Sequence, residues 1–253
     1  MKIDLHLHTS ERSVCSTATA EQHICSAIEY GLDAIVITDH DKLVPLGYLI
    51  ELNQRHRPFR IFGGIEIRIA DCGEDVLVLG LQEPVLEQKQ WLYGELHEYV
   101  GKMGGFICLN HPYRYSNEVR LDVCKYKPDA IEIHSTNIGR CDEDIIKNLA
   151  RKLNTRLVSN SDAHSHLHTG IFYNDIWGNP KTDAELVAFL KRGMYSLGRD
   201  ENRIECFNKN VHKREGLIRD LIAQGKTAED YSKMTGNWAG EYNRVAMGKS
   251  YII

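Results

Sequence analysis

The sequence lacks three features that would each place it in a particular class of protein. Among its 253 residues, 31 Lys and Arg stand against 35 Asp and Glu, so it has no basic excess of the kind that tracks a nucleic-acid backbone. It has no apolar run of about 18 residues, and its N-terminus does not follow the order of a signal peptide. These absences argue against a long polynucleotide partner, although a local basic site stays open, and against a membrane. They predict a cytoplasmic protein.

Paired cysteines are missing as well. The seven cysteines stand singly, without the C-x-x-C pair that would indicate a zinc knuckle or a redox motif. An odd count in a reducing compartment predicts free thiols that pack as small hydrophobic side chains. Cys15, in the loop that follows the first predicted strand, is the one thiol for which we expect a further role.

Short apolar runs alternate with helical patterns over residues 1–199, which predicts an α/β fold built from βα units. The segment DCGE between two apolar runs predicts a hairpin turn, so one inserted ribbon would interrupt a parallel barrel. Residues 200–253 lose this rhythm and contain one plausible long helix, HKREGLIRDLIAQG. We therefore expect a barrel domain over residues 1–199 and a helical extension over residues 200–253, packed on the barrel or over its mouth.

Polar side chains recur where the predicted strands end. In chain order they are His6 and His8, Asp39 and His40, Glu66, His111, Glu132 and His134, and Asp162 and His164. The C-terminal ends of parallel barrel strands meet at one mouth, so six strands deliver these side chains to one place. A solvent-facing position is an equal alternative for His134, and we expect His23, His56 and His97 to be surface or core residues of helices.

A mouth lined with imidazoles and carboxylates suits zinc, manganese or iron better than magnesium or calcium. The ligands are too many for one tetrahedral ion, which predicts two or three divalent ions with Glu66 or Asp162 as a bridge. Two ions about 3.5–4 Å apart turn a bound water into hydroxide and hold the attacking and leaving oxygens of a displacement. The expected reaction is hydrolysis of a phosphate ester.

Five stretches of the sequence, DLHLHT, ITDHD, GGIEI, LNHP and NSDAHS, resemble in order and spacing the motifs of the PHP (polymerase and histidinol phosphatase) family of metal-dependent phosphoesterases. The resemblance covers residues 3–165 and implies a distorted (β/α)7, TIM-like barrel with the metals at its mouth. It implies that one ion is held by His6, His8, Glu66 and Asp162, that a second is held by His40 and His164, and that Glu66 bridges toward His111. Asp39 would then orient His40 or carry a proton, the alternative being a cap on the following turn.

The sequence departs from the family pattern in two places. Members of the family commonly supply a histidine shortly after the glutamate strand, where this chain offers only Leu77 and Gln82. The loop after His8 usually carries a metal-binding Asp or His, and here Cys15 and Glu11 are the candidates. A thiolate ligand would favour zinc or iron over manganese.

Three arginines lie near the predicted ligands and are candidates for binding a substrate phosphate, namely Arg114, Arg68 and Arg12. Ordinary solvated arginines are the alternative. The predicted function is hydrolysis of a small phosphorylated metabolite or nucleotide. An amidohydrolase-type metal hydrolase and a non-catalytic, metal-stabilised scaffold are the alternatives. The first is weakened because no predicted strand ends on a lysine, and the second because nearly all ligands are retained.

Overall fold

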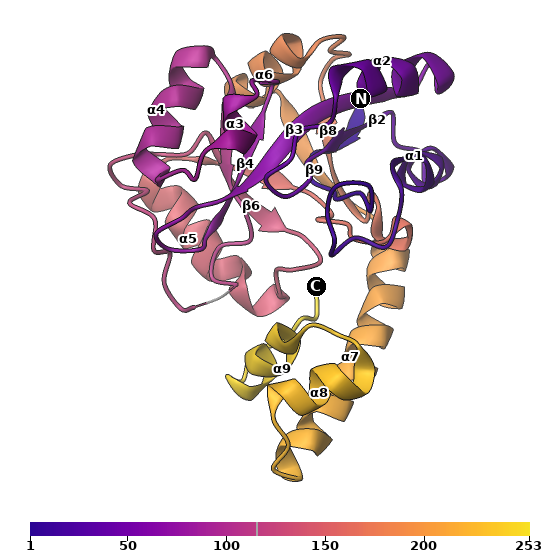
Figure 1. The fold of residues 1–253 in the computed structure, drawn as a ribbon, viewed down its shortest axis with the longest axis vertical. Coiled ribbons are helices and arrows are strands. Elements are labelled where there is room, and N and C mark those ends of the chain that lie inside the picture. The colour runs from indigo at the N-terminus through magenta and orange to yellow at the C-terminus, as the bar shows by residue number, and fades with distance from the viewer. Residues whose placement is uncertain (115) are drawn as a thin grey trace.

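One twisted sheet organises the molecule, a computed structural model that describes residues 1–114 and 116–253 (Figure 1). Within these residues its strands lie in the order β7-β6-β5-β4-β3-β2-β1-β8-β9. The strand bounds are β1 Lys2–Asp4, β2 Ala34–Ile37, β3 Arg60–Arg68, β4 Asp75–Leu79, β5 Phe106–Leu109, β6 Ala130–His134, β7 Arg156–Ser159, β8 Phe172–Ile176 and β9 Tyr195–Arg199.

Six strands, β1 to β3 and β5 to β7, run in one direction and carry their C-terminal ends to one end of the sheet, which we call the mouth. β4 is antiparallel to both β3 and β5, so the ribbon expected around DCGE is present. β8 is antiparallel to β1 and to β9, and its C-terminal end therefore lies at the opposite end of the sheet, which we call the base.

Helices cover the outer face of the sheet and form the C-terminal segment. Their bounds are α1 Ala20–Glu29, α2 Leu46–Arg55, α3 Val85–Gln88, α4 Tyr93–Met103, α5 Glu143–Leu153, α6 Asp183–Arg192, α7 Glu201–Ala223, α8 Ala228–Thr235 and α9 Ala239–Ala246, with short 3₁₀ turns at Arg140–Asp142 and His166–His168. Local sequence fixes several of their ends. Thr19 and Gln22 form a capping box at the start of α1, and Gly104 ends α4 in the left-handed conformation.

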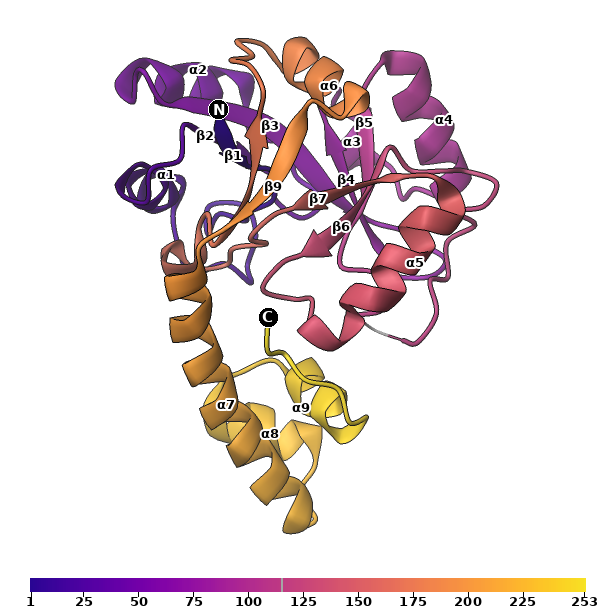
Figure 2. The ribbon, with the colours of Figure 1, turned by 180° about the vertical axis from the view of Figure 1, so that it is seen from behind.

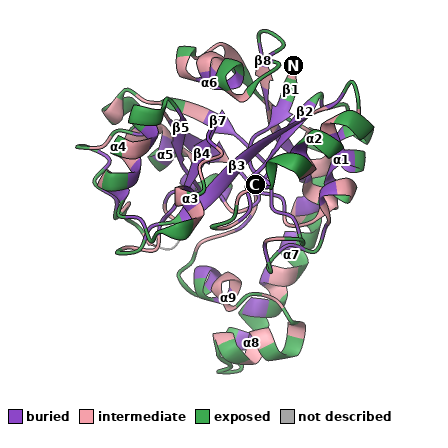
Figure 3. Cartoon of the chain, turned by 45° about the horizontal axis from the view of Figure 1, so that its top comes forward, coloured by how far each residue is buried: buried purple, intermediate pink, exposed green. Residues whose placement is uncertain are grey.

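Successive side chains of a strand point to opposite faces of the sheet, so that one set fills the barrel interior and the other packs against the outer helices. Leu77 and Leu79 of β4 join an interior cluster that draws on β1 to β8 and on α6. Val76 and Val78 belong instead to a cluster shared with α4 and α5. In Figure 3 most of the strands are accordingly buried and the outer sides of the helices are exposed, whereas β9 at the edge of the sheet has no buried residue.

The barrel closes through side chains where no strand ladder joins its two edges. The backbone N–H of Ser159 in β7 donates to Oδ1 of Asn174 in β8 at 3.0 Å, and its hydroxyl donates to the carbonyl of Gly198 in β9 at 3.2 Å. The result is a nearly closed, barrel-like sheet, which confirms the predicted α/β class. The strands are not all parallel, however, because β4 and β8 run against their neighbours.

The last residues form a helical segment at the mouth end. α7 continues from β9 and leads away from the barrel, and α8 and α9 lie beside it (Figure 2). The chain then returns to the barrel, where the carbonyl of Ile252 accepts the N–H of Arg140 and the buried Arg244 pairs with Asp142. No helix among the described residues is long and apolar enough to span a membrane. The proposed domain division at residues 199 and 200 stays a prediction.

Candidate metal centre

Histidine and carboxylate side chains from five strands lie together at the mouth. His6 and His8 follow β1, His40 follows β2, Glu66 lies in β3, His111 follows β5, and Asp162 and His164 follow β7. Only His40 and His164 of this set keep partial exposure. The structure thus brings together the seven histidines and carboxylates that the sequence suggested as ligands.

Glu66 is the centre of this cluster. Its Oε1 lies 3.3 Å from Nε2 of His6 and 3.2 Å from Nε2 of His111. Its Oε2 lies 2.8 Å from Nδ1 of His40 and 3.4 Å from Nε2 of His8. One carboxylate therefore reaches imidazoles that come from three different parts of the mouth.

Asp162 plays a similar part on the other side of His8. Its Oδ1 lies 3.1 Å from Nε2 of His8, 3.4 Å from Nε2 of His6 and 3.5 Å from Nδ1 of His164. The ring of His8 also lies between two others, with centroids 4.2 Å from His40 and 4.4 Å from His164.

Within the described residues, three sets of side chains can each place ligand atoms within 4.8 Å of one another. They are His8, His40 and His164; His6, His8 and Glu66; and Glu66, Asp75 and His111. His8 belongs to the first two sets and Glu66 to the last two. The sets are therefore adjacent, as ligands of neighbouring ions must be.

The donors fit divalent cations. Oε2 of Glu66 and Oδ1 of Asp162 are buried and form no hydrogen bond with the residues described, although imidazole nitrogens lie 2.8 Å and 3.1 Å away. Buried carboxylate oxygens that face nitrogens without a hydrogen bond are the arrangement expected of cation ligands, because ligand atoms about 2 Å from one ion lie about 3 Å from each other. The mixture of imidazole and carboxylate donors suits zinc, manganese or iron.

Proximity of these groups shifts their acidities. Burial lowers the pKa of His6, but the carboxylates of Asp162, Glu66 and Glu132 outweigh it and raise that pKa well above its ordinary value. Burial and the neighbouring imidazoles of His164 and His40 lower the pKa of His8 well below its ordinary value. The pKa values of two adjacent imidazoles are thus shifted in opposite directions by their surroundings.

Cys15, an exposed thiol in the loop after β1, lies outside the three sets of ligand atoms but interacts with two of their imidazoles, which Glu11 does not. Partial burial raises the pKa of the Cys15 thiol, but its interactions with the imidazoles of His164 and His40 outweigh this and lower the pKa to about 6. The carboxylate of Glu11 instead accepts the N–H of Ala20 at 3.0 Å, where it caps the start of α1. Of the two residues that the sequence offered for this loop, the thiol is the one near two ligand candidates.

Asp39 holds this loop in place. Its Oδ1 accepts the N–H of Thr9 at 2.6 Å and the hydroxyl of Ser13 at 2.7 Å, and its Oδ2 accepts the hydroxyl of Thr9 and Nε of Arg12, each at 2.8 Å. The Ser13 hydroxyl also accepts the backbone N–H of His40 at 3.0 Å. Asp39 therefore reaches His40 through Ser13 and the backbone, which differs from the direct orientation of its ring that the sequence suggested.

Glu132, to which the sequence assigned no role beyond its place at the end of a strand, contacts two of the ligand candidates. Its Oε1 lies 3.0 Å from Nδ1 of His6 and accepts Nδ2 of Asn160 at 2.8 Å, and its Oε2 accepts the N–H of His111 at 3.1 Å. A carboxylate on the far nitrogen of a ligating imidazole fixes its orientation and tautomer. The available signal was its place in β6, two residues before His134.

Asp75 is a second such residue, and it lies next to the position where the family pattern expects a histidine. In the β3–β4 pair, Leu77 faces Glu66 but joins the apolar interior, whereas Asp75 faces Arg68. Oδ2 of Asp75 lies 3.8 Å from Nε2 of His111, and the Asp75 carboxylate receives two bonds of 2.9 Å from the guanidinium of Arg68. The carboxylate of Asp75, two residues before Leu77, thus lies at the part of the mouth that holds His111.

The three candidate phosphate-binding arginines have different surroundings. Arg68 is held by Asp75, and Arg12 donates to Asp39 and Thr9. The guanidinium of Arg114 lies 4.8 Å from the ring centroid of Trp238, which belongs to the C-terminal helical segment.

Left-handed backbone marks the loop that carries Arg114. His111 has φ 24° and Tyr113 has φ 66°, values that cost about 1–3 kcal/mol for residues other than glycine. Lys249 of the C-terminal segment donates from Nζ to the carbonyl of Tyr113 at 3.2 Å. The C-terminal segment therefore holds a strained loop that begins at a ligand candidate.

The remaining histidines singled out from the sequence lie outside the three sets. Nδ1 of His134 is 3.1 Å from the Ser159 hydroxyl, and its ring stacks on Phe172. His23, His56 and His97 contact the Thr169 hydroxyl, the Glu21 carboxylate and the Lys127 carbonyl, respectively.

A protein-family model described as PHP domain matches residues 4–239 of the chain. A comparison with curated protein sequences found no match.

Several solved structures are similar in fold. A two-domain protein from Bacteroides vulgatus, described as containing a predicted PHP-like metal-dependent phosphoesterase, has a TM-score of 0.59 and 16% identity, over 83% of this chain and 70% of that one. An amidohydrolase from Chromobacterium violaceum with bound sulfate and no metal has a TM-score of 0.54 and 17% identity, over 65% and 88%. The lesion-specific endonuclease PfuEndoQ from Pyrococcus furiosus has a TM-score of 0.53 and 18% identity, over 78% and 57%. At these identities the likeness concerns the fold alone.

Proposed function

Because the chain belongs to the PHP domain family, we propose that it is a metal-dependent phosphoesterase that hydrolyses a small phosphorylated metabolite or nucleotide. The observation that carries this proposal is the sharing of His8 and Glu66 among three adjacent sets of ligand atoms. Adjacent ions serve displacement at phosphorus, since they stabilise both the attacking and the leaving oxygen.

The ligand assignment extends the one that the sequence suggested. His6, His8, Glu66 and Asp162 would hold one ion, and His40, His164 and Cys15 would hold another beside His8. Glu66, Asp75 and His111 would hold a third, with Asp75 in place of the histidine that this chain lacks. Zinc, manganese or iron bound there would activate water and neutralise the charge of a phosphoryl group.

Several residues would position these ligands without binding an ion. Glu132 orients the ring of His6, and Asp39 fixes the loop that carries Cys15. Asn110 donates from Nδ2 to Oε1 of Glu66 at 2.9 Å, and Asn137 donates to Oδ2 of Asp162. These contacts leave the other oxygen of each carboxylate available for a cation.

Arg114 and Arg68 are the residues we assign to the substrate phosphate. Both come from segments that also supply ligands, since Arg114 follows His111 by three residues and Arg68 follows Glu66 by two. A guanidinium binds two phosphate oxygens at once, which orients the ester. Arg12 is the third candidate. Arg68 and Arg12 would each offer a phosphate only part of the guanidinium, because Nε and Nη2 of Arg68 donate to Asp75 and those of Arg12 donate to Asp39 and Thr9. Residues 200–253 would form an extension of the barrel domain that borders this side of the mouth.

A substrate panel tests the proposal. Purified protein is stripped with chelator and reloaded with manganese or zinc, and is then offered phosphomonoesters, phosphodiesters, a single-stranded oligonucleotide, an amide and a lactone. We expect phosphate release from small esters that disappears on stripping and returns on reloading. Hydrolysis of only the amide or lactone would favour an amidohydrolase. Metal binding without turnover of any of these compounds would favour a scaffold.

A further inference from the structure

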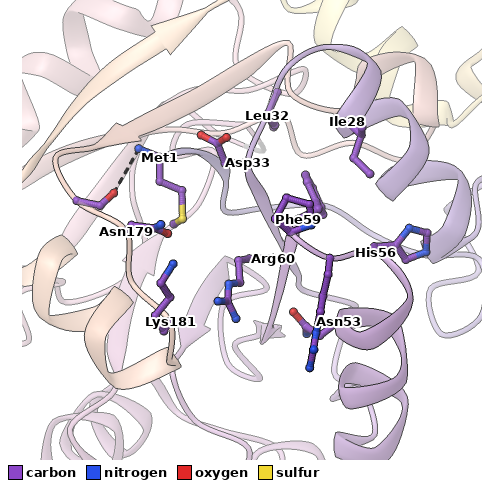
Figure 4. Close-up of a pocket in the computed structure, with 13 residues that line it drawn as sticks. Met1, Ile28, Leu32, Asp33, Asn53, His56, Phe59, Arg60, Asn179 and Lys181 are labelled. Carbon is purple, nitrogen blue, oxygen red and sulfur yellow. Dashed lines mark hydrogen bonds between the residues drawn. The ribbon is translucent and has the colours of Figure 1, made fainter.

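The base of the barrel holds a cavity of about 850 Å³ that is separate from the mouth (Figure 4). Its walls come from segments at the base, where Asp33 precedes β2, Arg60 begins β3, and Lys181 follows β8. Of the described residues that line it, none is a metal-ligand candidate. Whatever it binds would act independently of the hydrolysis proposed above.

Three cations, Arg57, Arg60 and Lys181, line this cavity. The same three also line a neighbouring hollow of about 290 Å³, so they stand between the two spaces. Nowhere in residues 1–114 and 116–253 does a carboxylate pair with any of them. Arg60 is partly buried, and a guanidinium withdrawn from water without an acceptor carries a desolvation cost that a bound anion would offset.

Two acidic groups do not neutralise these cations. Asp33 lines the larger cavity, where its Oδ2 accepts the backbone N–H of Lys2 at 2.8 Å. Asp183 lines only the smaller hollow, and among the described residues its carboxylate forms no ion pair with the three cations. The cavity between them keeps a positive balance.

Part of the cavity wall is apolar. Ile28, Leu32 and Phe59 line it, and Ile28 remains about half exposed to the space. The volume lies within the range of about 300–1,000 Å³ that is common for small-molecule sites. A ligand that carries a phosphate at one end and an apolar body at the other would therefore fit this cavity, with its phosphate at the cations and its apolar body at the apolar residues.

We propose that the base cavity binds a phosphorylated small molecule of nucleotide size. Its phosphate would contact Arg57, Arg60 and Lys181, and its organic portion would lie against Ile28 and Phe59. The mouth would take no part in this binding.

Calorimetric titration with ADP and with pyrophosphate tests the proposal in the full chain. A variant with Arg60→Met and Lys181→Met removes two cations at nearly constant side-chain length. A matched control with Arg151→Met and Lys209→Met removes the same charge from the outer faces of α5 and α7. A third variant, Asp162→Ala, disables the mouth.

We expect the base cavity of wild type and of Asp162→Ala to bind ADP with the same affinity, whether or not the mouth of wild type also binds ADP. The cavity should bind ADP more tightly than pyrophosphate, because only ADP reaches the apolar part of the wall. The base variant should bind ADP about tenfold more weakly or worse, the change expected when a charge-assisted hydrogen bond is lost. The matched control should change affinity less than about twofold, since exposed charges are screened by salt. Thermal midpoints show whether the variants fold, and Arg57→Met replaces the double variant if it does not.

The proposal is overturned if wild type binds neither probe, or if the base variant binds ADP as wild type does. Loss of binding in Asp162→Ala would also overturn it, because the probe would then have occupied the mouth. Phosphatase activity measured on the same base variant stays as in wild type whether or not the base cavity binds ADP. Failure of this proposal is thereby distinguishable from failure of the proposed hydrolysis.

Discussion

The two ends of the barrel handle charge in opposite ways. At the mouth, buried carboxylates and imidazoles lie within 4 Å of one another and leave oxygens without hydrogen bonds. At the base, Arg57, Arg60 and Lys181 border a cavity and have no acidic partner among the residues described. The mouth is therefore able to bind cations, and we propose that the base binds an anion. Opposite charge at opposite ends of one sheet would give each end its own ligand, and substitutions at the mouth test this contrast.

The largest effect should come from removing a ligand at the mouth. Asp162→Ala takes away a carboxylate that reaches three imidazoles, so we expect loss of at least one ion per chain. Activity should fall by more than about a hundredfold, the upper effect of changing only a residue that supports a ligand. Elemental analysis and phosphate release measure the two quantities. Asp144→Ala on the exposed side of α5 is the control, and a fully active Asp162→Ala would remove the metal centre from the mechanism.

Glu132→Gln should have the next effect. The amide keeps the shape of the side chain but loses the negative charge next to Nδ1 of His6. We expect affinity for the ion on His6 to fall by about tenfold to a hundredfold, as is usual when the partner of a ligating imidazole is changed. Competition with a fluorescent chelator measures it. Glu143→Gln, a carboxylate paired with Lys147 outside the mouth, should keep wild-type affinity, and an equal drop in both variants would contradict the orienting role.

Sequence alone predicted the α/β class and the residues that gather at the mouth. It could do so because parallel strands put their C-terminal ends together, so position along the chain stands in for position in space. His6, Glu66 and Asp162 were therefore identifiable before any coordinates. The ribbon was also predictable, since the DCGE turn separates two apolar runs.

The rest depended on pairings that sequence does not encode locally. Asp75 reaches His111 only because β4 runs against β3 and places it opposite Arg68. Asp39 serves a loop some 30 residues earlier in the chain, and its bonds follow from how that loop folds. Such partners are determined by how strands pair and how loops fold, which the hydrophobic periodicity of the sequence does not reveal. The cations of the base cavity were missed for a similar reason: Arg57 and Lys181 lie between elements and Arg60 begins β3, and only the fold brings these segments together.

Cys15 gives a smaller and more selective test of the mouth. If the thiolate binds an ion beside His40 and His164, Cys15→Ala should lower the affinity for that ion about tenfold, which is roughly the loss of one charged contact. The affinity for the ion on His6 should stay unchanged. Cys15→Asp should keep the site and shift its preference from zinc toward manganese, because oxygen is the harder ligand. Metal content after dialysis against each ion reports both. Cys25→Ala, an exposed thiol on α1, is the matched control, and wild-type metal content in Cys15→Ala would mean that the thiol only packs.

The smallest effect should come from the contact between the C-terminal segment and the mouth. Lys249 donates to the carbonyl of Tyr113, within the strained loop that starts at His111. Lys249→Met removes this donor, so the loop should relax and move Arg114 relative to the metals. Because the lysine is partly exposed, we expect a loss in kcat/KM of only about fivefold, seen mainly in KM, at unchanged metal content. Lys249→Arg should restore most of the loss because it keeps a cationic donor. Lys233→Met, which removes an exposed cation of α8, should match wild type. If Lys249→Met also matches wild type, the C-terminal segment does not position the loop that carries Arg114, and the difference in charge between mouth and base depends on barrel residues alone.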